Sequence, residues 1–514
     1  MDRSWTIGVE RMRKDSMDWL AARSALTPHR TAAINAETGE LWSFLQMNER
    51  ACGLAGYLEA AGVAPGDRVA VLAQNDLCCW DALFACIKLR AVFVPLNWRL
   101  SGSELSAIVS DCTPKALLYH SELEPLARGL FAPITLQADG AEYEGIVRAA
   151  IALRHPETER SDEAAESCMM IYSGGTTGKP KGVVLSHQSV LWNMLNTIVS
   201  WNLTASDVTV TSLPLFHTGG INALCLPILY AGGTVVVSKE SRAEPLMELI
   251  QRYACTIVLM VPTMYRMMID LPAFAHAQFP HVHTFLSGGA PCPIAVYEAF
   301  ESKGLTFKEG YGLTEAGPNN FYMDPRAVVH KQGSVGKPMM LVQVKIVSDS
   351  GCEAAIGDVG EIWLRGKHVF QCYWNQPETT QSVFVDGWLR TGDLGRRDQD
   401  GFYYIVGRKT DMIITGGENV YPVEVEQLMM EHPAVKEAAV VGIPDPKWGE
   451  SVVAAVALHL DHGLTDEELR SYCIGKIGKY KIPKRFLFLQ ELPKTHVGKV
   501  DKKRICQMYQ EMNG

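Results

Sequence analysis

The first third of the chain alternates short apolar runs with amphipathic segments, and this alternation restricts the fold more than any other feature. Residues 45–61 carry apolar side chains at helical spacing and end in a turn at 62–66. Residues 68–73 and 92–96 are apolar runs typical of buried strands, and 77–89 predicts a second helix. Strands that alternate with helices of this length form βαβ units around a parallel sheet that is covered on both faces. We therefore expect an α/β fold with a large N-terminal domain of stacked βαβ-type sheets.

Two changes of pattern follow this region. From 333 to about 407, β-branched runs are separated by Gly and Asp turns, which predicts a β-rich subdomain. Near 408 the pattern changes again. Pro422 opens a predicted helix through about 430, and 435–441 and 452–458 predict strands. The last hundred residues are thus expected to form a small α+β C-terminal domain.

Composition and charge exclude several classes of protein. Hydrophobic residues make up 47% and charged residues 20% of the 514, as in globular proteins, so a disordered or fibrous chain is excluded. The net charge of −9 argues against a nucleic-acid partner and against a polybasic membrane binder. The acid-rich stretch 154–167 predicts an exposed loop. Residues 1–17 have no apolar core of the kind that a signal peptide needs. The uncharged stretch 218–238 has the length of a membrane span but is broken by Pro227 and two Gly pairs. We expect no signal peptide and no transmembrane segment. Thirteen cysteines without a C-x-x-C pair fit reduced thiols, and we expect a cytoplasmic protein.

A glycine-rich segment directly follows the predicted strand 168–172. It comprises Ser173, Gly174, Gly175, Thr176, Thr177, Gly178, Lys179, Pro180, Lys181 and Gly182. Its glycines let backbone N–H groups approach a ligand, its threonines add hydroxyl donors and its lysines add positive charge, so it suits a triphosphate. It is not a P-loop, because Ser173 and Pro180 stand where that motif needs Gly and Ser or Thr. A flexible surface turn is the alternative interpretation.

With this segment the sequence resembles the acyl-adenylate-forming (AMP-binding) enzyme family, in its acyl-CoA synthetase branch. The family's phosphate loop ends in T-G-x-P-K-G, which residues 177–182 match; Gly174 stands where serine is common. Other segments resemble the family's motifs and follow in the family's order over most of the chain: 214–220, 287–291, 310–315, 391–393, 407–408, 416–422 and 493–499. Coincidence does not readily produce so many motifs in one order.

The resemblance implies nucleotide-binding roles for most of these residues. The glycine-rich segment would hold the triphosphate of ATP, and Asp393 and Arg408 would hold the ribose. Glu315 would hold Mg²⁺, with Thr314 touching the same phosphate oxygens. The residues assigned to adenine and phosphate are Gly289, Ala290, Pro291, Glu309, Gly310, Tyr311 and Gly312. Without the resemblance, Tyr311 would be an ordinary core tyrosine and Glu315 a glutamate favoured at a helix start.

The resemblance also assigns the chemistry. Lys499 would neutralise the acid's carboxylate and the α-phosphate together, because these anions repel each other as they meet. His217 would line the acyl tunnel or gate the thiol, without acid–base work. Gly416, Gly417 and Glu418 would form the tunnel for the thiol of CoA. Taken alone, Lys499 would be a solvated surface lysine and His217 a core histidine.

Members of the family close the C-terminal domain in two orientations around a hinge. The hinge position corresponds to Thr410, where the family usually has Asp or Lys. We therefore expect an N-terminal adenylation domain over 1–407, a hinge over 408–411, and a small mobile C-terminal lid domain over 412–514.

The implied activity is that of an acid–CoA ligase that uses ATP, Mg²⁺ and CoA. The acid attacks the α-phosphate, pyrophosphate leaves, and the CoA thiol then displaces AMP from the acyl-AMP. The expected pocket segments 262–265, 285–288 and 317–322 carry no charge, which favours an apolar acid, although Arg266 could anchor a dicarboxylate. A medium- or long-chain fatty acid is the first expectation, and an aryl or cyclic acid is the alternative.

Three rival classes are weighed against an acid–CoA ligase. A stand-alone adenylation domain would carry an aspartate near 216–218 for the substrate's amino group, and none is present. A luciferase-like oxygenase shares every motif. A nucleotide-binding module without catalysis is disfavoured by the presence of Glu315 and Lys499. The oligomeric state is left open, a homo-oligomer included.

Overall fold

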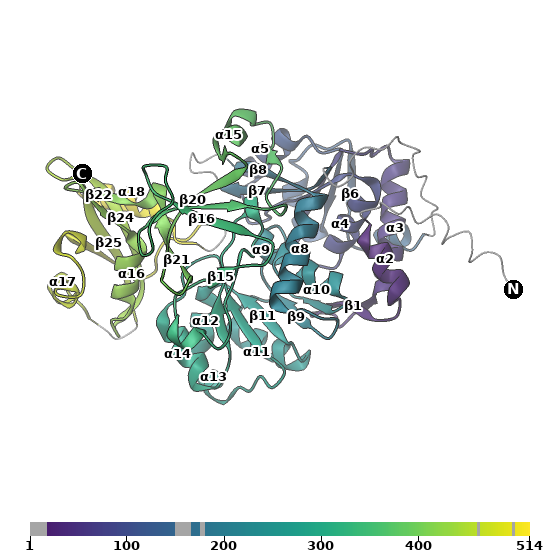
Figure 1. Ribbon diagram of the computed structural model, residues 1–514. Helices are drawn as coiled ribbons and strands as arrows, with labels where there is room; N and C mark the ends of the chain where they lie inside the picture. Colours follow the sequence, from purple (N-terminus) through teal and green to yellow (C-terminus); the bar gives the residue numbers. More distant parts are fainter. Residues whose placement is uncertain (1–17, 150–165, 175–179, 460–462, 496–498, 514) are drawn as a thin grey trace.

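The computed structural model describes residues 18–149, 166–174, 180–459, 463–495 and 499–513. Figure 1 shows a large N-terminal part, coloured purple to green, and a smaller yellow-green part that carries the C-terminus at one end. The sequence expectations for residues 1–17, and for nearly all of the loop at 154–167, lie outside the described residues.

A seven-stranded sheet forms the centre of the N-terminal part. Its strand order is β18 (Cys372–Tyr373), β8 (Pro180–Ser186), β7 (Ser167–Gly174), β4 (Val92–Pro95), β3 (Arg68–Leu72), β5 (Ala116–Tyr119) and β6 (Ile134–Gln137). Strands β4, β3, β5 and β6 are parallel, as the alternating pattern predicts, and β7 and β8 form an antiparallel hairpin. Along β3, Val69 and Val71 pack into one hydrophobic core, and Ala70 and Leu72 pack into another. Both faces of this sheet are therefore covered.

Helices α3 (Phe44–Ala60) and α4 (Cys78–Leu89) confirm the first two predicted helices. Helix α3 begins where Ser43 and Gln46 form a reciprocal capping box, which satisfies two backbone N–H groups at the helix start. The other helices of the N-terminal part are α2 (Trp19–Leu26), α5 (Gly102–Cys112), α6 (Glu124–Ala127), α7 (Ala141–Val147), α8 (His187–Trp201), α9 (Thr218–Asn222), α10 (Cys225–Ala231), α11 (Ala243–Arg252), α12 (Pro262–Ile269), α13 (Pro272–His276), α14 (Ile294–Ser302) and α15 (Pro377–Ser382).

Two further sheets lie side by side. One has the order β2 (Leu41–Ser43), β1 (Thr31–Asn35), β10 (Thr234–Val237), β9 (Val208–Thr211), and the other β11 (Ile257–Met260), β12 (Thr284–Ser287), β13 (Phe307–Glu309). The Thr256 N–H donates to the Val208 carbonyl at 2.8 Å, which joins their edges. Residues 218–238 form α9, α10 and β10, as expected for a buried segment rather than a membrane span.

The predicted β-rich subdomain is an antiparallel sheet of β16 (Gln343–Val347), β17 (Gly360–Arg365), β20 (Trp388–Arg397), β19 (Phe384–Val385) and β21 (Tyr403–Arg408), with the pair β14 (Phe321–Tyr322) and β15 (Lys337–Pro338) beside it. One turn of 3-10 helix, Lys409–Asp411, then leads from β21 to β22 (Ile413–Thr415). This turn separates the two parts of the molecule.

The C-terminal part has a second antiparallel sheet with one parallel edge strand. It consists of β23 (Glu418–Val420), β22, β25 (Gly449–Leu458), β24 (Val435–Asp445) and β26 (Arg485–Leu489), with helices α16 (Pro422–Met430), α17 (Asp466–Cys473) and α18 (Lys502–Asn513). Helix α16 confirms the helix predicted to open at Pro422. The predicted strands at 435 and 452 are longer than expected, because β24 and β25 continue as a hairpin to residues 445 and 449.

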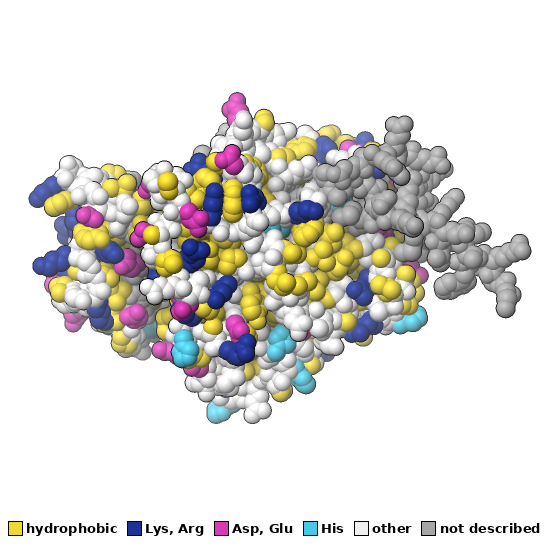
Figure 2. Space-filling view, in the orientation of Figure 1, with side chains coloured by type: hydrophobic (Ala, Val, Ile, Leu, Met, Phe, Trp, Pro, Cys, Tyr) yellow, Lys and Arg dark blue, Asp and Glu magenta, His cyan; other side chains and the backbone are white. Residues whose placement is uncertain are grey.

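Residues 476–504 are rich in lysine and arginine, and several of these side chains form ion pairs. Lys481 binds Glu424 at 2.7 Å, Lys502 binds Glu426 at 2.7 Å, and Lys494 binds Glu437. Figure 2 shows basic and acidic side chains interspersed over this part of the surface. This mixed charge does not resemble a nucleic-acid-binding stripe. In the described part of the chain, no helix combines the length and the apolar composition that crossing a bilayer requires.

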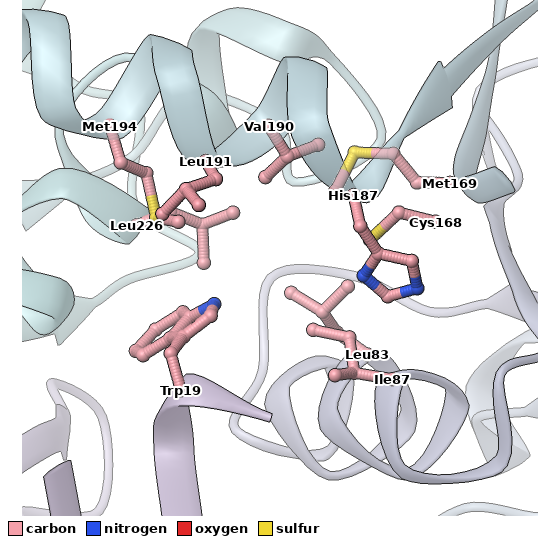
Figure 3. Close-up of a pocket in the computed structure, with 10 residues that line it drawn as sticks. All are labelled: Trp19, Leu83, Ile87, Cys168, Met169, His187, Val190, Leu191, Met194 and Leu226. Carbon is pink, nitrogen blue, oxygen red and sulfur yellow. The ribbon is translucent and has the colours of Figure 1, made fainter. Parts of the chain in front are cut away.

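A small apolar cavity lies between α2, α4, α8 and α10. Figure 3 shows Trp19, Leu83 and Leu226 among the side chains that point into it. Its volume is about 10 Å³, room for roughly one water molecule. The cavity is therefore a packing defect of the core rather than a substrate pocket.

Candidate active site

The loops that carry most of the expected nucleotide contacts start where three parallel strands end. Strands β11, β12 and β13 end at Met260, Ser287 and Glu309. The Gly288 N–H donates to the Met260 carbonyl at 3.3 Å, and the Gly310 N–H donates to the Ser287 carbonyl at 2.8 Å. Open α/β sheets bind ligands at this edge, outside the carboxyl ends of their strands. The structure thus places 288–291 and 310–312 side by side in a position suited to a ligand.

The loop after β13 turns back on itself. A Cβ atom at Gly312 would lie 2.2 Å from the Pro318 carbonyl carbon, so only glycine fits there. The Leu313 N–H donates to the Gly317 carbonyl at 3.2 Å and closes the turn. This turn presents Thr314 and Glu315 on a short 3-10 helix, Thr314–Ala316.

Glu309 is buried and its carboxylate has protein partners. Oε2 accepts from the Tyr297 hydroxyl at 2.7 Å, and Oε1 accepts from the Cys292 N–H at 3.2 Å. Burial raises the pKa of Glu309 to about 8, against the lowering effect of these two hydrogen bonds. The side chain therefore ties the loop at 288–292 to β13, while Ala290 and Pro291 lie at the surface of that loop.

Asp393 joins Tyr311 and Arg408 into one group through a hydrogen bond and an ion pair. Asp393 on β20 faces Arg408 on β21 across the sheet. The Arg408 Nε atom lies 3.2 Å from Asp393 Oδ1, and the Tyr311 hydroxyl donates to Asp393 Oδ2 at 2.6 Å. Burial raises the pKa of Asp393, and Arg408 and the Tyr311 hydroxyl oppose that rise. The structure brings together the residues expected to contact adenine and ribose.

Glu315 lies beside a tyrosine that the sequence did not single out. The Tyr373 hydroxyl on β18 donates to Glu315 Oε1 at 2.8 Å. Lys181 lies at the start of β8, and its ammonium group is 5.2 Å from the centre of the Tyr373 ring. Burial raises the pKa of Glu315, and the Tyr373 hydrogen bond opposes this. Tyr373 lies in none of the motifs named above, so local sequence did not point to this contact.

The glycine-rich segment sits on the β7–β8 hairpin. Ser173 pairs with Lys181 and Gly174 pairs with Pro180 across that hairpin. Gly175, Thr176, Thr177, Gly178 and Lys179 connect these two strands and lie outside the described residues. Because β18 pairs with β8, the hairpin and Tyr373 belong to one sheet. The ends of the predicted phosphate loop thus lie close to Glu315.

His217 precedes α9 and is packed against the Phe216 ring, with ring centres 4.8 Å apart. Its Nε2 atom is buried and has no hydrogen-bond partner among the described residues. Burial, with smaller effects of Lys499 and Arg99, lowers the pKa of His217 to about 4. The imidazole is therefore neutral at pH 7.

Lys499 belongs to the C-terminal part and lies near Asp393, Arg408 and His217 of the N-terminal part. It directly precedes Val500, which forms a short antiparallel bridge with Lys494, and its carbonyl accepts from the Thr495 N–H at 2.7 Å. The surroundings of Lys499 lower its pKa through desolvation and through Arg408, and Asp393 opposes this. Part of the Lys499 side chain remains exposed to solvent. Lys499 thus lies within electrostatic reach of Asp393, Arg408 and His217.

The Gly416–Gly417 turn is not part of this group. It connects β22 to β23, with Thr415 paired to Glu418. Both glycines have positive φ, 61° and 85°, as the two-residue hairpin turns that match strand twist require. Gly416, Gly417 and Glu418 are exposed, and the Gly416 N–H donates to the Trp448 carbonyl at 2.8 Å. In this orientation the C-terminal part places Lys499 near Asp393 and Arg408, whereas Gly416, Gly417 and Glu418 lie on its own surface.

Two family models match the chain. The AMP-binding enzyme model matches residues 20–374, and the model of the AMP-binding enzyme C-terminal domain matches residues 424–499. The chain belongs to the AMP-binding enzyme family.

Curated relatives of this AMP-binding enzyme match it over nearly their whole length. A feruloyl-CoA synthase from Amycolatopsis sp is 36% identical over 96% of this chain and 98% of its own. An indoleacetate–CoA ligase from Aromatoleum aromaticum is 36% identical over 96% of this chain and 97% of its own. A long-chain-fatty-acid–CoA ligase from Mycobacterium tuberculosis is 32% identical over 95% of this chain and 97% of its own.

Solved structures resemble it equally fully. The o-succinylbenzoate CoA synthetase of Bacillus subtilis, in complex with its acyl-adenylate intermediate, matches with a TM-score of 0.84 and 31% identity over 95% of this chain and 97% of its own. ATP-bound MatB from Rhodopseudomonas palustris matches with a TM-score of 0.88 and 29% identity over 97% of this chain and 100% of its own. The expected family and fold class are confirmed.

This AMP-binding enzyme is an ATP-dependent acid–CoA ligase that uses ATP, Mg²⁺ and CoA with a small-molecule carboxylic acid. The chemistry of its residues fits Mg²⁺, because that cation usually takes one or two carboxylates together with phosphate oxygens. Glu315 would offer that carboxylate, since it accepts from the Tyr373 hydroxyl and Tyr373 lies beside Lys181 on the hairpin of the predicted phosphate loop.

Proposed function

We propose that this ligase activates a ring-bearing acid with a hydrogen-bond donor, such as a hydroxylated aryl acid. The observation that carries the proposal is a pair of buried acceptors around α9. The Asn193 Oδ1 and Asn222 Oδ1 atoms are buried, and neither has a hydrogen-bond partner in the described part of the chain. A buried acceptor without a donor costs about 1–3 kcal/mol, so a substrate donor that reaches one is favoured.

The two asparagines are held in place by their amide groups. The Asn193 Nδ2 atom donates to the Asn222 carbonyl at 2.8 Å, and the Asn222 Nδ2 atom donates to the Thr218 hydroxyl at 3.1 Å. A Cβ atom at Gly317 would lie 2.5 Å from Asn193 Oδ1, so this oxygen faces the loop that carries Glu315. An alkyl chain would leave both oxygens unpaired, whereas a phenolic hydroxyl or an indole N–H would pair with one of them. The names of the two relatives at 36% identity support the same class of acid.

A medium- or long-chain fatty acid is the second candidate. One observation favours it: a Cβ atom at Gly219 would meet nothing within 4 Å, so space is open beside His217. The relative named for long-chain fatty acids is 32% identical.

The proposed first half-reaction joins the acid to the α-phosphate. Asp393 and Arg408 hold the ribose, Tyr311 holds the adenine, and Glu315 with Thr314 holds Mg²⁺, which offsets phosphate charge when bound. Lys499 donates to the carboxylate and the α-phosphate together and so lowers their mutual repulsion. Positioning and charge stabilisation supply the catalysis, since no protein group forms a covalent bond.

The proposed second half-reaction follows a rotation of the C-terminal domain, 412–514, about the turn at 408–411. The rotation removes Lys499 and brings Gly416, Gly417 and Glu418 toward the acyl-AMP, where they line the path of the CoA thiol. The neutral imidazole of His217 packs beside that path and takes no proton. The N-terminal domain, 1–407, keeps the nucleotide throughout.

A matched set of acids tests the proposed substrate class. Pyrophosphate release is measured with 4-hydroxycinnamic acid, cinnamic acid, indoleacetic acid, octanoic acid and palmitic acid. We expect the hydroxylated ring to exceed its unsubstituted partner in kcat/KM by roughly tenfold, the value of one buried hydrogen bond. Asn193→Leu should remove that preference. Asn196→Leu on the same helix is the control, because Asn196 Oδ1 already accepts from the Leu341 N–H at 3.0 Å. A clear preference for octanoate or palmitate would contradict the proposal and support the second candidate.

A further inference from the structure

A cluster of metal-binding side chains lies away from the nucleotide residues. Within the described residues, Asp76, Cys78 and His120 each offer one ligand atom, and these atoms all lie within 4.8 Å of one another. The Cys78 Sγ and His120 Nε2 atoms are 3.0 Å apart. The motifs of the family do not include any of the three residues.

The cluster is assembled by the carboxyl ends of two parallel strands. His120 directly follows β5, and its N–H donates to the Leu72 carbonyl at the end of β3 with a distance of 3.1 Å. Cys78 is the first residue of α4, which follows β3. Strands β4, β7 and β8 separate β3 from β18, the strand that carries Tyr373 next to Glu315. The cluster and the proposed Mg²⁺ site therefore lie at different places on the same sheet.

We propose that Asp76, Cys78 and His120 bind a divalent zinc-like cation. A thiolate, an imidazole and a carboxylate are the three ligand types that Zn²⁺ takes, usually in tetrahedral geometry with water in any open position. Bond lengths of about 2.3 Å to sulfur and about 2.1 Å to nitrogen and oxygen place tetrahedral ligand atoms roughly 3.5 Å apart. Small side-chain rotations would bring the three ligand atoms to that spacing.

The surroundings hold the ligands in place and favour a cation. Asp76 Oδ1 accepts from the Cys78 N–H at 3.1 Å, and Asp76 Oδ2 accepts from the Asn35 amide at 3.4 Å. Metal sites commonly fix their ligands through such outer contacts. The charged groups that act on His120 and Cys78 are four acidic side chains and one lysine: Asp76, Asp81, Glu122, Asp139 and Lys239.

Burial distinguishes this cluster from a nucleophilic cysteine site. Cys78 is 3% exposed and His120 is 4% exposed, so neither can meet an organic substrate. Asp76 is only partly buried and provides the side from which a small cation enters. A metal ion is the kind of ligand that fits a site of this size.

A cobalt titration of the full-length protein tests the proposal. The protein is stripped with a chelator and returned to saturating Mg²⁺, so that hard oxygen sites are filled, and Co²⁺ alone is then added. We expect one equivalent to bind, with a thiolate-to-cobalt absorption band, tetrahedral d–d bands, and displacement by Zn²⁺. Cys78→Ser should abolish the thiolate band, whereas Cys352→Ser, which alters an exposed thiol, should leave it unchanged.

Asp76→Asn is the second variant and keeps the size of the side chain. It should weaken Co²⁺ binding at least about tenfold, as loss of a ligand or its support does. Its ligase rate with Mg²⁺ should remain that of the parent, which shows that the fold is intact. The proposal is overturned if no thiolate band forms, if the band survives in Cys78→Ser, or if Asp76→Asn binds Co²⁺ as tightly as the parent.

Discussion

The Tyr373 hydroxyl donates to the Glu315 carboxylate at 2.8 Å, across 58 residues of sequence. Glu315 lies within the turn after β13, and Tyr373 lies on an edge strand of the sheet that carries the phosphate-loop hairpin. The hydrogen bond favours the ionised carboxylate in a site where burial favours the protonated one. Tyr373 is therefore a positioning residue for the group proposed to hold Mg²⁺.

Tyr373→Phe should raise the Mg²⁺ concentration that half-saturates pyrophosphate release by roughly 3- to 10-fold, the value of one hydrogen bond to a charged group. The pKa of Glu315 should rise further without the hydroxyl donor, so the acid-side fall in rate should move to higher pH. The measurement is the Mg²⁺ dependence of pyrophosphate release between pH 6 and pH 8.

Two other variants serve as the comparison and the control for Tyr373→Phe. Glu315→Gln should depress acyl-AMP formation more strongly than Tyr373→Phe and leave the fold intact. Tyr404→Phe is the matched control, because the Tyr404 hydroxyl donates to Asp398 Oδ2 at 3.4 Å on a different sheet, that of the β-rich subdomain. Unchanged Mg²⁺ dependence in both Glu315→Gln and Tyr373→Phe would place the metal elsewhere.

Lys499→Ala should separate the two half-reactions. The ammonium is useful where the acid meets the α-phosphate, so pyrophosphate release should fall by about 10²–10³-fold. Thioester formation from synthetic acyl-AMP and CoA should stay close to the parent rate, because the electrophile is already formed. The assays are pyrophosphate release and thioester formation, each measured alone.

The pH profile gives an independent check on Lys499. Its surroundings lower its pKa below the ordinary value of 10.5, and the ammonium is lost as pH rises through that lowered value. The rate of adenylation should therefore fall at a pH below the one at which an ordinary lysine titrates. The rate of thioester formation should not show this alkaline decrease. A thioester step that suffers more than adenylation in Lys499→Ala would assign the lysine to CoA instead.

Thr410→Pro should affect the two half-reactions unequally. Thr410 is exposed in the single 3-10 turn between β21 and β22, and proline fixes φ near −65°. A fixed pivot holds one domain orientation and disfavours the other. Single-turnover measurements of each step give the ratio. Equal slowing of both steps would place the pivot at another residue, and Thr410→Ala is the control for loss of the side chain.

Glu309→Gln should change the pH dependence of stability. Burial raises the folded-state pKa of Glu309 to about 8, above its unfolded value of 4.5, so the folded protein binds one more proton between these values. The parent should therefore lose stability as pH rises from about 5 to 8, by a few kcal/mol at most. Glutamine can accept from the Cys292 N–H and donate to the Tyr297 hydroxyl, so the variant should lack this loss. Urea unfolding at pH 5 and pH 8 measures the difference, and a parallel pH dependence in parent and variant would contradict it.

Local pattern was sufficient for much of the fold. Helices α3, α4 and α16 lie within a residue or two of their predicted bounds, because their apolar spacing and their turn or proline signals act within a few residues. The extension of β24 and β25 was missed. Residues 442–451 contain Gly, Pro and Asp, which suggest a loop, yet cross-strand pairing carries the ladder through them.

The site was predictable only where it follows a motif. Asp393 and Arg408 were named from short segments, and the structure pairs them across a sheet. Tyr373 could not be named, since its partner is distant in sequence and its neighbours carry no motif. The same holds for Asp76 and His120, which two strand ends bring together. Contacts that depend on sheet order leave no trace in local spacing.

The position of Arg408 has a mechanical consequence. This residue is the last of β21, and the turn at Lys409–Asp411 begins with the next residue. When one body swings about a pivot, points next to the pivot hardly move and distant points sweep a long arc. The sugar contact at Arg408 would therefore stay almost still during the swing, while Lys499, some ninety residues further on, travels far enough to leave. The nucleotide would thus keep the same contact with Arg408 in both half-reactions. A residue's distance from the pivot would determine whether the rotation moves it into or out of the site.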